Sequence, residues 1–221
     1  MCGIIGINNN SESAMLAYMG LYAQQHRGQE GAGVVSSDGV NLHRHMGQGL
    51  VSDVFSDSNV FDGLIGESAI GHVRYSTTGD SDNKNVGPLT FNMGDYYLSI
   101  AHNGNLVNIE EMRTNLQEDG ALFQTSTDTE VIIHLIAREK GNNLAEKVEK
   151  ALLKIEGAYS LLLLSPYEII AARDPHGIRP FCMGKLKDTI VFASETCALD
   201  LLGAQYLRDV QPGEMIVASG D

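Results

Sequence analysis

The chain begins with MCGIIGI (residues 1–7), a short apolar stretch that runs into three consecutive asparagines. Its composition predicts a short buried strand. Cys2 directly follows the initiator methionine, and its small side chain permits removal of Met1. Removal would give Cys2 a free α-amine with a pKa of about 7.7–8.0, within reach of the thiol of the same residue. The stretch therefore predicts a nucleophile and a base that come from one residue.

Two interpretations of Cys2 remain open on these grounds alone. A cysteine at an arbitrary position in a strand is most often a small buried hydrophobic residue. Position 2, followed by Gly3, favours the nucleophile, because a glycine lets a substrate approach the backbone closely. With Met1 attached the amine base is absent, so we expect the unprocessed chain to be inactive.

The composition limits the classes of function. The 15 Lys and Arg against 28 Asp and Glu give a net charge of −13, which argues against a nucleic-acid partner and an anionic membrane surface. No apolar run approaches the ~18 residues of a membrane span, and residues 1–7 lack the charged start of a signal peptide. The three cysteines show neither disulfide-framework nor zinc-site spacing, so we expect a cytoplasmic protein without a metal.

The order of predicted elements is strands, then helices, then strands, within one large domain or two small ones. Hydrophobic periodicity and turn signals predict strands at residues 1–7, 34–36, 40–46, 68–75, 96–102, 159–164, 169–173, 180–184, 190–194 and 215–218. Helices are predicted at 14–23, 109–116, 127–140 and 144–155, with a short one near Leu199. In the third helix, Thr127 and Glu130 have the spacing of a capping box. This order indicates an α+β protein with antiparallel sheets covered by helices.

Two segments could serve a thiol that attacks an amide. Asn103 and Gly104 follow a predicted strand and could donate a side-chain amide and a backbone N–H to an oxyanion. Taken alone, the pair is more typical of an Asn-Gly turn. Arg74 ends another predicted strand, where it could bind a carboxylate through two hydrogen bonds. A surface ion pair is its alternative role.

Asp128 lies in the first turn of a predicted helix, where a carboxylate suits the helix dipole and could also bind a substrate ammonium. Residues 77–88 form a polar, glycine-containing segment between two predicted strands, which makes them a candidate lid. His43 and His45 share one face of a strand, but no third ligand accompanies them, so we predict no metal site.

These residues lie in segments that resemble the class II glutamine amidotransferases. The segments are MCGIIG (1–6), QHRGQEGAG (25–33), GHVRYST (71–77), AHNGN (101–105), STDTE (126–130), RDPHGIRP (173–180) and ASE (193–195). The match is colinear from residue 2 to about Glu214. It is greatest for the glutaminase domains of the amidophosphoribosyltransferase branch, because the hexosamine-synthesising branch usually carries Tyr at the positions of His26 and Gln29. The segment GLVSDVF (49–55) favours the same branch.

The resemblance implies an N-terminal-nucleophile hydrolase fold, a four-layer αββα sandwich of two antiparallel sheets. It also implies a role for each matching residue. Cys2 would be the nucleophile, Asn103 and Gly104 the oxyanion hole, Arg74 the ligand of the glutamine α-carboxylate and Asp128 that of its α-ammonium. Thr77 and the loop after it would close over the substrate, with Arg27 and Gly28 in supporting roles.

The activity implied by the resemblance is hydrolysis of L-glutamine to glutamate and ammonia through a thioester on Cys2. Residues 1–221 would form one type 2 glutamine amidotransferase domain. In the family pattern, the ammonia goes to a phosphoribosyltransferase domain that makes 5-phosphoribosylamine in purine synthesis. That domain, which would bind magnesium and phosphoribosyl pyrophosphate, is absent from these residues, and no cofactor is expected in this chain.

Several alternatives stay open at this point. The chain could be a domain of a longer enzyme or a free-standing glutaminase that serves a separate synthase subunit. Another branch of the family, which makes glucosamine phosphate or asparagine, is a second alternative. A third is an N-terminal-nucleophile amidase that acts on other amides, and a fourth is a non-catalytic binding module that keeps Met1. The sequence leaves homo-oligomer formation open.

Overall fold

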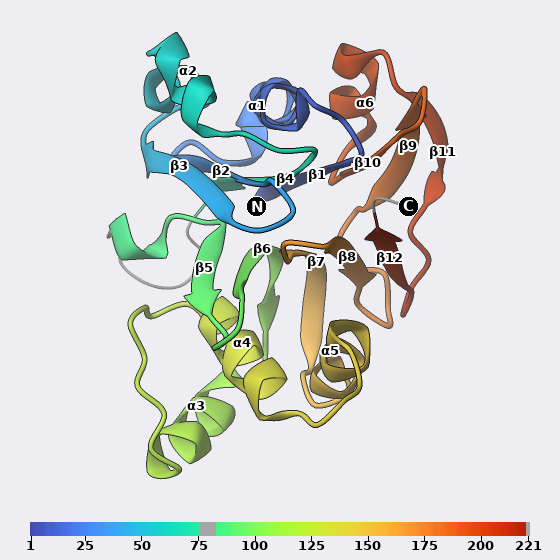
Figure 1. The fold of residues 1–221 in the computed structure, drawn as a ribbon. Coiled ribbons are helices and arrows are strands. Elements are labelled where there is room, and N and C mark those ends of the chain that lie inside the picture. The colour runs from blue at the N-terminus through green and yellow to red at the C-terminus, as the bar shows by residue number, and fades with distance from the viewer. Residues whose placement is uncertain (76–82, 220–221) are drawn as a thin grey trace.

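The structure is a computed structural model that describes residues 1–75 and 83–219 (Figure 1). Its strands form a seven-stranded sheet, in the order β11-β9-β10-β1-β4-β2-β3, and a five-stranded sheet, in the order β12-β8-β7-β6-β5. The first sheet contains β1 (Gly3–Asn8), β2 (Gly31–Ser37), β3 (Leu42–Gln48), β4 (Ser68–Arg74), β9 (Cys182–Leu186), β10 (Thr189–Ala193) and β11 (Gln205–Asp209). The second contains β5 (Leu89–Asn92), β6 (Tyr97–Leu106), β7 (Gly157–Leu164), β8 (Glu168–Arg173) and β12 (Met215–Ser219).

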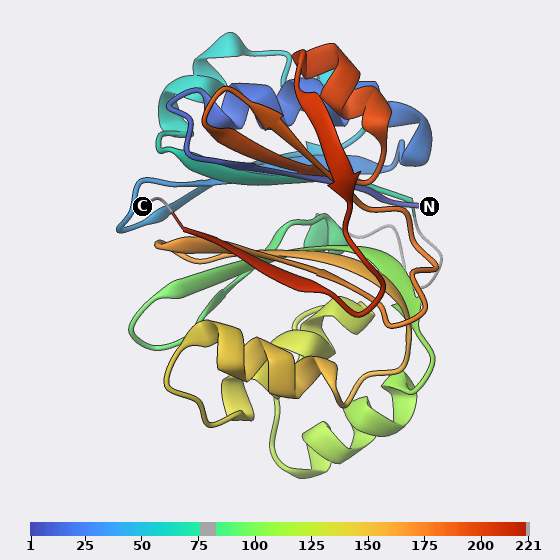
Figure 2. The ribbon, with the colours of Figure 1, turned by 90° about the vertical axis from the view of Figure 1, so that its right-hand side faces the viewer.

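The two sheets face each other, and a layer of helices covers the outer face of each (Figure 2). Helices α1 (Ser13–Ala23), α2 (Val51–Val54) and α6 (Thr196–Leu202) cover the seven-stranded sheet, together with the short 3-10 helices η1 (Gln25–Arg27) and η2 (Ser58–Gly63). Helices α3 (Ile109–Glu118), α4 (Asp128–Arg138) and α5 (Leu144–Leu152) cover the other sheet. A third 3-10 helix, η3 (Asn83–Asn85), leads into β5.

Alternation along the strands builds one core between the sheets and one under each helical layer. Ile4 of β1 belongs to the core between the sheets, whereas its neighbour Ile5 packs under α1. Leu162 of β7 reaches across from the other sheet, and its Cδ2 lies 3.1 Å from where a Cβ on Gly6 would stand. All strand pairs among the described residues are antiparallel. The predicted α+β class with two antiparallel sheets is therefore confirmed.

Two local predictions are wrong. Strand β6 does not end at His102 but continues to Leu106, so the alternative interpretation of Asn103 and Gly104 as a turn is excluded as well. Strand β6 extends past His102 because β7 pairs with it along this stretch, where Gly104 lies opposite Tyr159. The predicted capping box is also absent, since Thr127 makes no side-chain cap bond and Glu130 accepts hydrogen bonds from the preceding loop instead.

The packing between the sheets gives a stability prediction. Leu162→Ala should lower the free energy of unfolding by about 2–5 kcal/mol, because the truncation leaves a cavity in a core that is closed on both sides. The same truncation at Leu153, which is 81 % exposed, should change it by less than about 0.5 kcal/mol. Chemical denaturation monitored by circular dichroism measures both values. Equal losses in the two variants would contradict this description of the core.

His72 of β4 is a buried imidazole within this frame. Burial lowers its pKa to about 3, and the nearby charges of His102 and Arg74 contribute in the same direction. An unfolded chain binds this proton below about pH 6.5. Between these two values unfolding takes up a proton at His72, so the free energy of unfolding must fall as the pH falls.

We therefore expect His72 alone to lower the free energy of unfolding by about 2 kcal/mol between pH 7 and pH 5. The variant His72→Gln, which does not titrate, should lose this part of the pH dependence whatever its stability at pH 7. Denaturation midpoints at half-unit pH steps provide the measurement. If wild type and variant lose stability in parallel below pH 6.5, the imidazole is not kept neutral by the fold.

Candidate functional site

One cavity brings residues from distant parts of the chain around Cys2. About 490 Å³ of empty space lies between its walls, including the solvent at its open mouth. Its walls come from β4, from the segment before β5, from β6 and from the start of α4. The lining residues are Cys2, His72, Arg74, Tyr75, Asn85, Gly87, Leu89, Ile100, His102, Gly104, Thr127, Asp128 and Thr129.

Cys2 is held through its main chain, while its thiol faces the cavity. The carbonyl oxygen of Cys2 accepts a hydrogen bond from Arg27 Nε at 2.8 Å. With the Asn103 amide oriented so that both of its polar atoms are satisfied, its nitrogen donates to the same carbonyl at 3.1 Å. The thiol lies against the backbone of Tyr75, whose N–H is 3.5 Å from Sγ. The residue is therefore fixed at the backbone, and its sulfur remains accessible.

Arg27 reaches Cys2 because η1 packs closely against the end of β4. A Cβ on Gly28 would lie 2.6 Å from the backbone carbonyl of Arg74, so only glycine allows this approach. The buried Arg27 guanidinium also forms an ion pair with Glu195 and donates from Nη2 to the Asn103 oxygen at 3.2 Å. Burial opposes the charge of Glu195, but hydrogen bonds from Arg27 and His26 hold the pKa of its carboxyl below the ordinary value.

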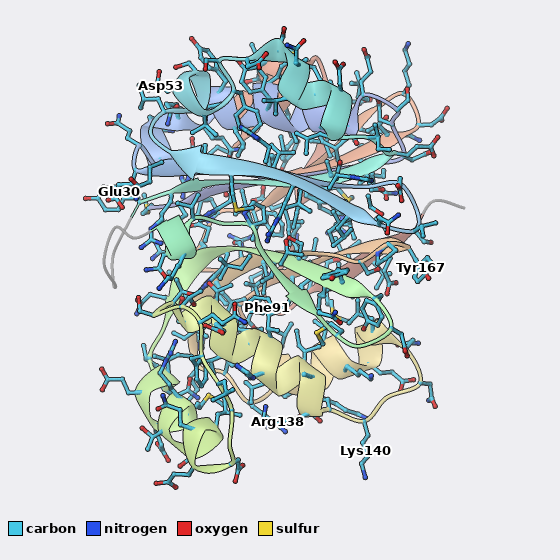
Figure 3. All side chains as sticks on the ribbon, turned by 60° about the vertical axis from the view of Figure 1, so that its left-hand side comes forward. Glu30, Asp53, Phe91, Arg138, Lys140 and Tyr167 are labelled. Atoms are coloured by element: carbon cyan, nitrogen blue, oxygen red, sulfur yellow. The ribbon has the colours of Figure 1, made fainter. Side chains whose placement is uncertain are left out.

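Arg74 places a buried cation at one side of the cavity. Its Nη1 donates to the backbone carbonyl of Asn85, and its Nε lies 3.8 Å from the carboxylate of Glu30. Figure 3 shows Glu30 where the chain enters β2, at the end of the seven-stranded sheet. Because Arg74 is only 5 % exposed, its charge is poorly screened by water and acts strongly on an anion in the cavity.

Asp128 places an anion at the other side of the cavity. Its Oδ2 accepts a hydrogen bond from the backbone N–H of Leu106 at 3.2 Å, and its Oδ1 lies 3.4 Å from His102 Nδ1. Burial opposes ionisation, yet the His102 ring and the Leu106 N–H hold the pKa of Asp128 below its ordinary value. The cavity therefore has a cationic and an anionic end, with a thiol in its wall.

The two residues predicted for an oxyanion hole lie differently. Gly104 lines the cavity, and a Cβ there would be 2.1 Å from the carbonyl oxygen of Ala158, so β7 requires glycine at this position. Asn103 is fully buried and directs its amide to the Cys2 backbone; it is not among the lining residues. Its side chain is thus next to the nucleophile residue but turned away from the cavity.

The structure brings together most of the residues predicted from sequence. Cys2, Arg74, Gly104 and Asp128 line one cavity, while Arg27, Gly28 and Asn103 support it from behind. Thr77 lies outside the described residues, as does the first part of the predicted lid.

Sequence reasoning missed several lining residues. His72 stands two positions before Arg74 on the same strand, so period-two alternation could have placed it on the same face. Asn85 gave no comparable signal, since it meets Arg74 through its backbone carbonyl and not through a residue pattern.

The described residues contain one group with metal-ligand chemistry. Donor atoms of His26, Glu195 and Cys197 lie within 4.8 Å of one another. The Glu195 carboxylate already pairs with Arg27, so this group first serves to hold the arginine that binds the Cys2 carbonyl. No helix in the described part of the chain is long and apolar enough to cross a membrane.

Comparison with known proteins places the chain in a family. A family model described as a glutamine amidotransferase domain matches residues 72–201. An amidophosphoribosyltransferase of Bacillus subtilis is 45 % identical over 221 residues, which cover 100 % of this chain and 46 % of that protein. Amidophosphoribosyltransferase 2 of Arabidopsis thaliana, named as chloroplastic, is 50 % identical over 223 residues, which cover 100 % of this chain and 39 % of that protein.

Solved structures agree with these matches. One described as the allosteric regulatory enzyme of purine biosynthesis superposes with a TM-score of 0.95 at 46 % identity and covers 99 % of this chain and 47 % of that one. The B. subtilis glutamine phosphoribosylpyrophosphate amidotransferase, complexed with ADP and GMP, gives a TM-score of 0.94 at 45 % identity, with 99 % and 47 % covered. These superpositions confirm the predicted N-terminal-nucleophile fold.

The chain spans less than half the length of these curated relatives. Within that span, the resemblance found in the sequence motifs, the family model and the superpositions all point to the same domain. The chain belongs to the family of glutamine amidotransferase domains.

Proposed function

We propose that the chain hydrolyses the side-chain amide of L-glutamine and releases ammonia. The observation that carries the proposal is the placement of a thiol, a buried cation and an ionised carboxylate around one cavity. Free glutamine has an α-carboxylate and an α-ammonium at one end and an uncharged amide at the other. Arg74 and Asp128 would bind the two charges, which leaves the amide to Cys2.

The proposed reaction uses Cys2 after removal of Met1. The thiol proton passes to the α-amine, and the thiolate sulfur attacks the carbonyl carbon of the side-chain amide of glutamine. The carbon–nitrogen bond then breaks, and the proton held by the amine goes to the departing ammonia. A γ-glutamyl thioester remains, and water attacks it to release glutamate and restore the thiol.

Asn103 and Gly104 would stabilise the negative charge that develops on the amide oxygen. Gly104 lies in the cavity wall, and the Asn103 amide lies 3.1 Å from the Cys2 carbonyl, so a turn of this side chain toward bound substrate would complete the pair. Arg27 would keep the Cys2 backbone in place during this change, and Gly28 lets Arg27 reach it.

The names of the relatives support a more specific role. Proteins 45–50 % identical to this chain are amidophosphoribosyltransferases, so we infer that the ammonia serves 5-phosphoribosylamine formation in purine synthesis. In this proposal the acceptor, phosphoribosyl pyrophosphate with magnesium, binds to a phosphoribosyltransferase domain or a separate synthase subunit, and this chain uses no cofactor. Assignment of residues 1–221 to one domain and a cytoplasmic location stay predictions.

The nucleophile assignment makes the first functional prediction. Cys2→Ala should reduce glutamate release at least about a thousandfold, and Cys2→Ser nearly as much, because a hydroxyl is a much weaker acid for the amine base. Both variants should keep the wild-type unfolding temperature. The measurement is a coupled glutamate assay on protein whose Met1 removal is verified by mass spectrometry. Cys182→Ala removes a different thiol and serves as the control that keeps turnover. Turnover by Cys2→Ala would refute the assignment.

The substrate-binding assignment makes a second prediction. Arg74→Lys keeps the positive charge but loses the planar pair of N–H donors, so KM for glutamine should rise about tenfold or more while kcat changes little. Initial rates over a range of glutamine concentrations separate the two constants. An unchanged KM would exclude Arg74 from the binding of the α-carboxylate.

A further inference from the structure

The loop that leads into α4 carries part of the cavity wall. Thr127 and Asp128 line the cavity, and the preceding residues 124–126 belong to the connection between α3 and α4. Two charged side chains that are absent from the cavity lining hold this loop, namely Glu130 of α4 and Arg113 of α3.

The carboxylate of Glu130 holds the loop by accepting hydrogen bonds from the N–H and hydroxyl groups of the loop. Its Oε1 accepts from Gln124 N at 2.8 Å, and its Oε2 accepts from Thr125 N and Thr125 Oγ1, each at 2.7 Å. The side chain is 1 % exposed, so these donors replace the water that a carboxylate requires. Its place in the first turn of α4 also suits the positive end of the helix dipole.

Arg113 holds the same loop by donating hydrogen bonds to the backbone carbonyl groups of the loop. Its Nη1 donates to Thr125 O at 3.1 Å, and its Nη2 donates to Thr127 O at 2.7 Å. The guanidinium carbon lies 4.1 Å from the centre of the Phe123 ring, which fixes the plane of the group. The two donors of one rigid fork thus set the spacing of two carbonyls that flank Ser126.

The loop connects the two charged ends of the cavity. Ser126 exchanges two hydrogen bonds with the Asn85 side chain, at 3.1 Å and 3.3 Å. The backbone carbonyl of Asn85 in turn accepts from Arg74. Asp128 follows the loop directly, so a displacement of residues 124–127 would move both Arg74 and Asp128.

We infer that Arg113 and Glu130 are positioning residues that set the separation of Arg74 and Asp128 and thereby the affinity for the amino-acid end of glutamine. This inference rests on the proposed function. The groups that Arg74 and Asp128 would bind do not change during hydrolysis. Loss of their spacing should therefore weaken binding of substrate and transition state alike, which raises KM and leaves kcat nearly unchanged.

Two conservative variants test the inference. Arg113→Lys keeps the charge but cannot bind both carbonyls, and Glu130→Gln keeps the shape but loses acceptors for the loop. We expect each to raise KM at least fivefold with kcat within threefold of wild type. The double variant should raise KM by less than the product of the single effects, because both residues act through one loop.

Matched substitutions elsewhere control for charge and helix position. Glu146 occupies the first turn of α5 and accepts from the backbone N–H of Asn142, so Glu146→Gln makes the same change in a loop far from Cys2. Arg138, labelled in Figure 3, is the last residue of α4, whereas Asp128 is the first, and Arg138→Lys matches the arginine change. Both controls should leave KM unchanged.

A second readout measures binding without turnover. Iodoacetamide should alkylate Cys2 of the Met1-free chain, with the modified residue identified by peptide mapping, and glutamine should protect it. The glutamine concentration for half protection should rise at least fivefold in Arg113→Lys and Glu130→Gln, whereas the alkylation rate without glutamine should not change.

The outcomes separate the two proposals. If glutamine protects the wild-type thiol but no glutamate is released, the hydrolase function is refuted. The glutamine concentration for half protection would then still test the role of Arg113 and Glu130. Loss of kcat at constant KM, or constant half protection, would overturn the positioning role, because a merely destabilised fold lowers the active fraction only. Absence of protection by glutamine in wild type would refute both.

Discussion

The site depends on hydrogen bonds to one main-chain carbonyl, that of Cys2. Arg27 donates to this carbonyl, and so does the Asn103 amide, which comes from the other sheet. Cys2, directly before the first residue of β1, is therefore held by residues from both sides of the sandwich. A chain end is ordinarily mobile, and a nucleophile on it would be poorly aimed. The Arg27 guanidinium can do this only because Glu195 balances its buried charge and Gly28 leaves room for its approach. The face-to-face packing of the sheets thus holds the backbone of Cys2, and with it the thiol, in a defined position.

The second physical feature is the charge separation across the cavity. Arg74 and Asp128 both line the cavity. In the proposed function they would bind the opposite charges on the α-carbon of an amino acid and select it by both sign and spacing. Each of these charges is itself held by neutral polar groups, namely the Asn85 carbonyl and the Leu106 N–H. Charged neighbours contribute as well, since Arg74 Nε lies 3.8 Å from the Glu30 carboxylate and Asp128 Oδ1 lies 3.4 Å from His102 Nδ1.

The sequence predicted the parts of the site that depend on local patterns. The place of Cys2 behind Met1, of Arg74 at a strand end and of Asp128 at a helix start predicts these three as site residues, and the structure brings them to one cavity. The order of the elements predicts the fold class, which is confirmed. The failures involve partners distant in the chain. The predicted strand end at His102 is wrong because pairing with β7 extends β6. The predicted capping role of Glu130 is wrong because its carboxylate accepts hydrogen bonds from the loop before α4. Asn85 lines the cavity next to Arg74 and Ser126, residues distant in sequence that no local pattern pairs with it.

The most direct test of the central claim is covalent labelling with an electrophilic glutamine analogue. The chain freed of Met1 is incubated with the analogue, and peptide mass spectrometry locates the adduct, with the unprocessed chain as control. The account predicts one adduct, on the Cys2 sulfur of the processed chain, and none on Cys182, Cys197 or the control. An unlabelled processed chain, or an adduct confined to another cysteine, would contradict it.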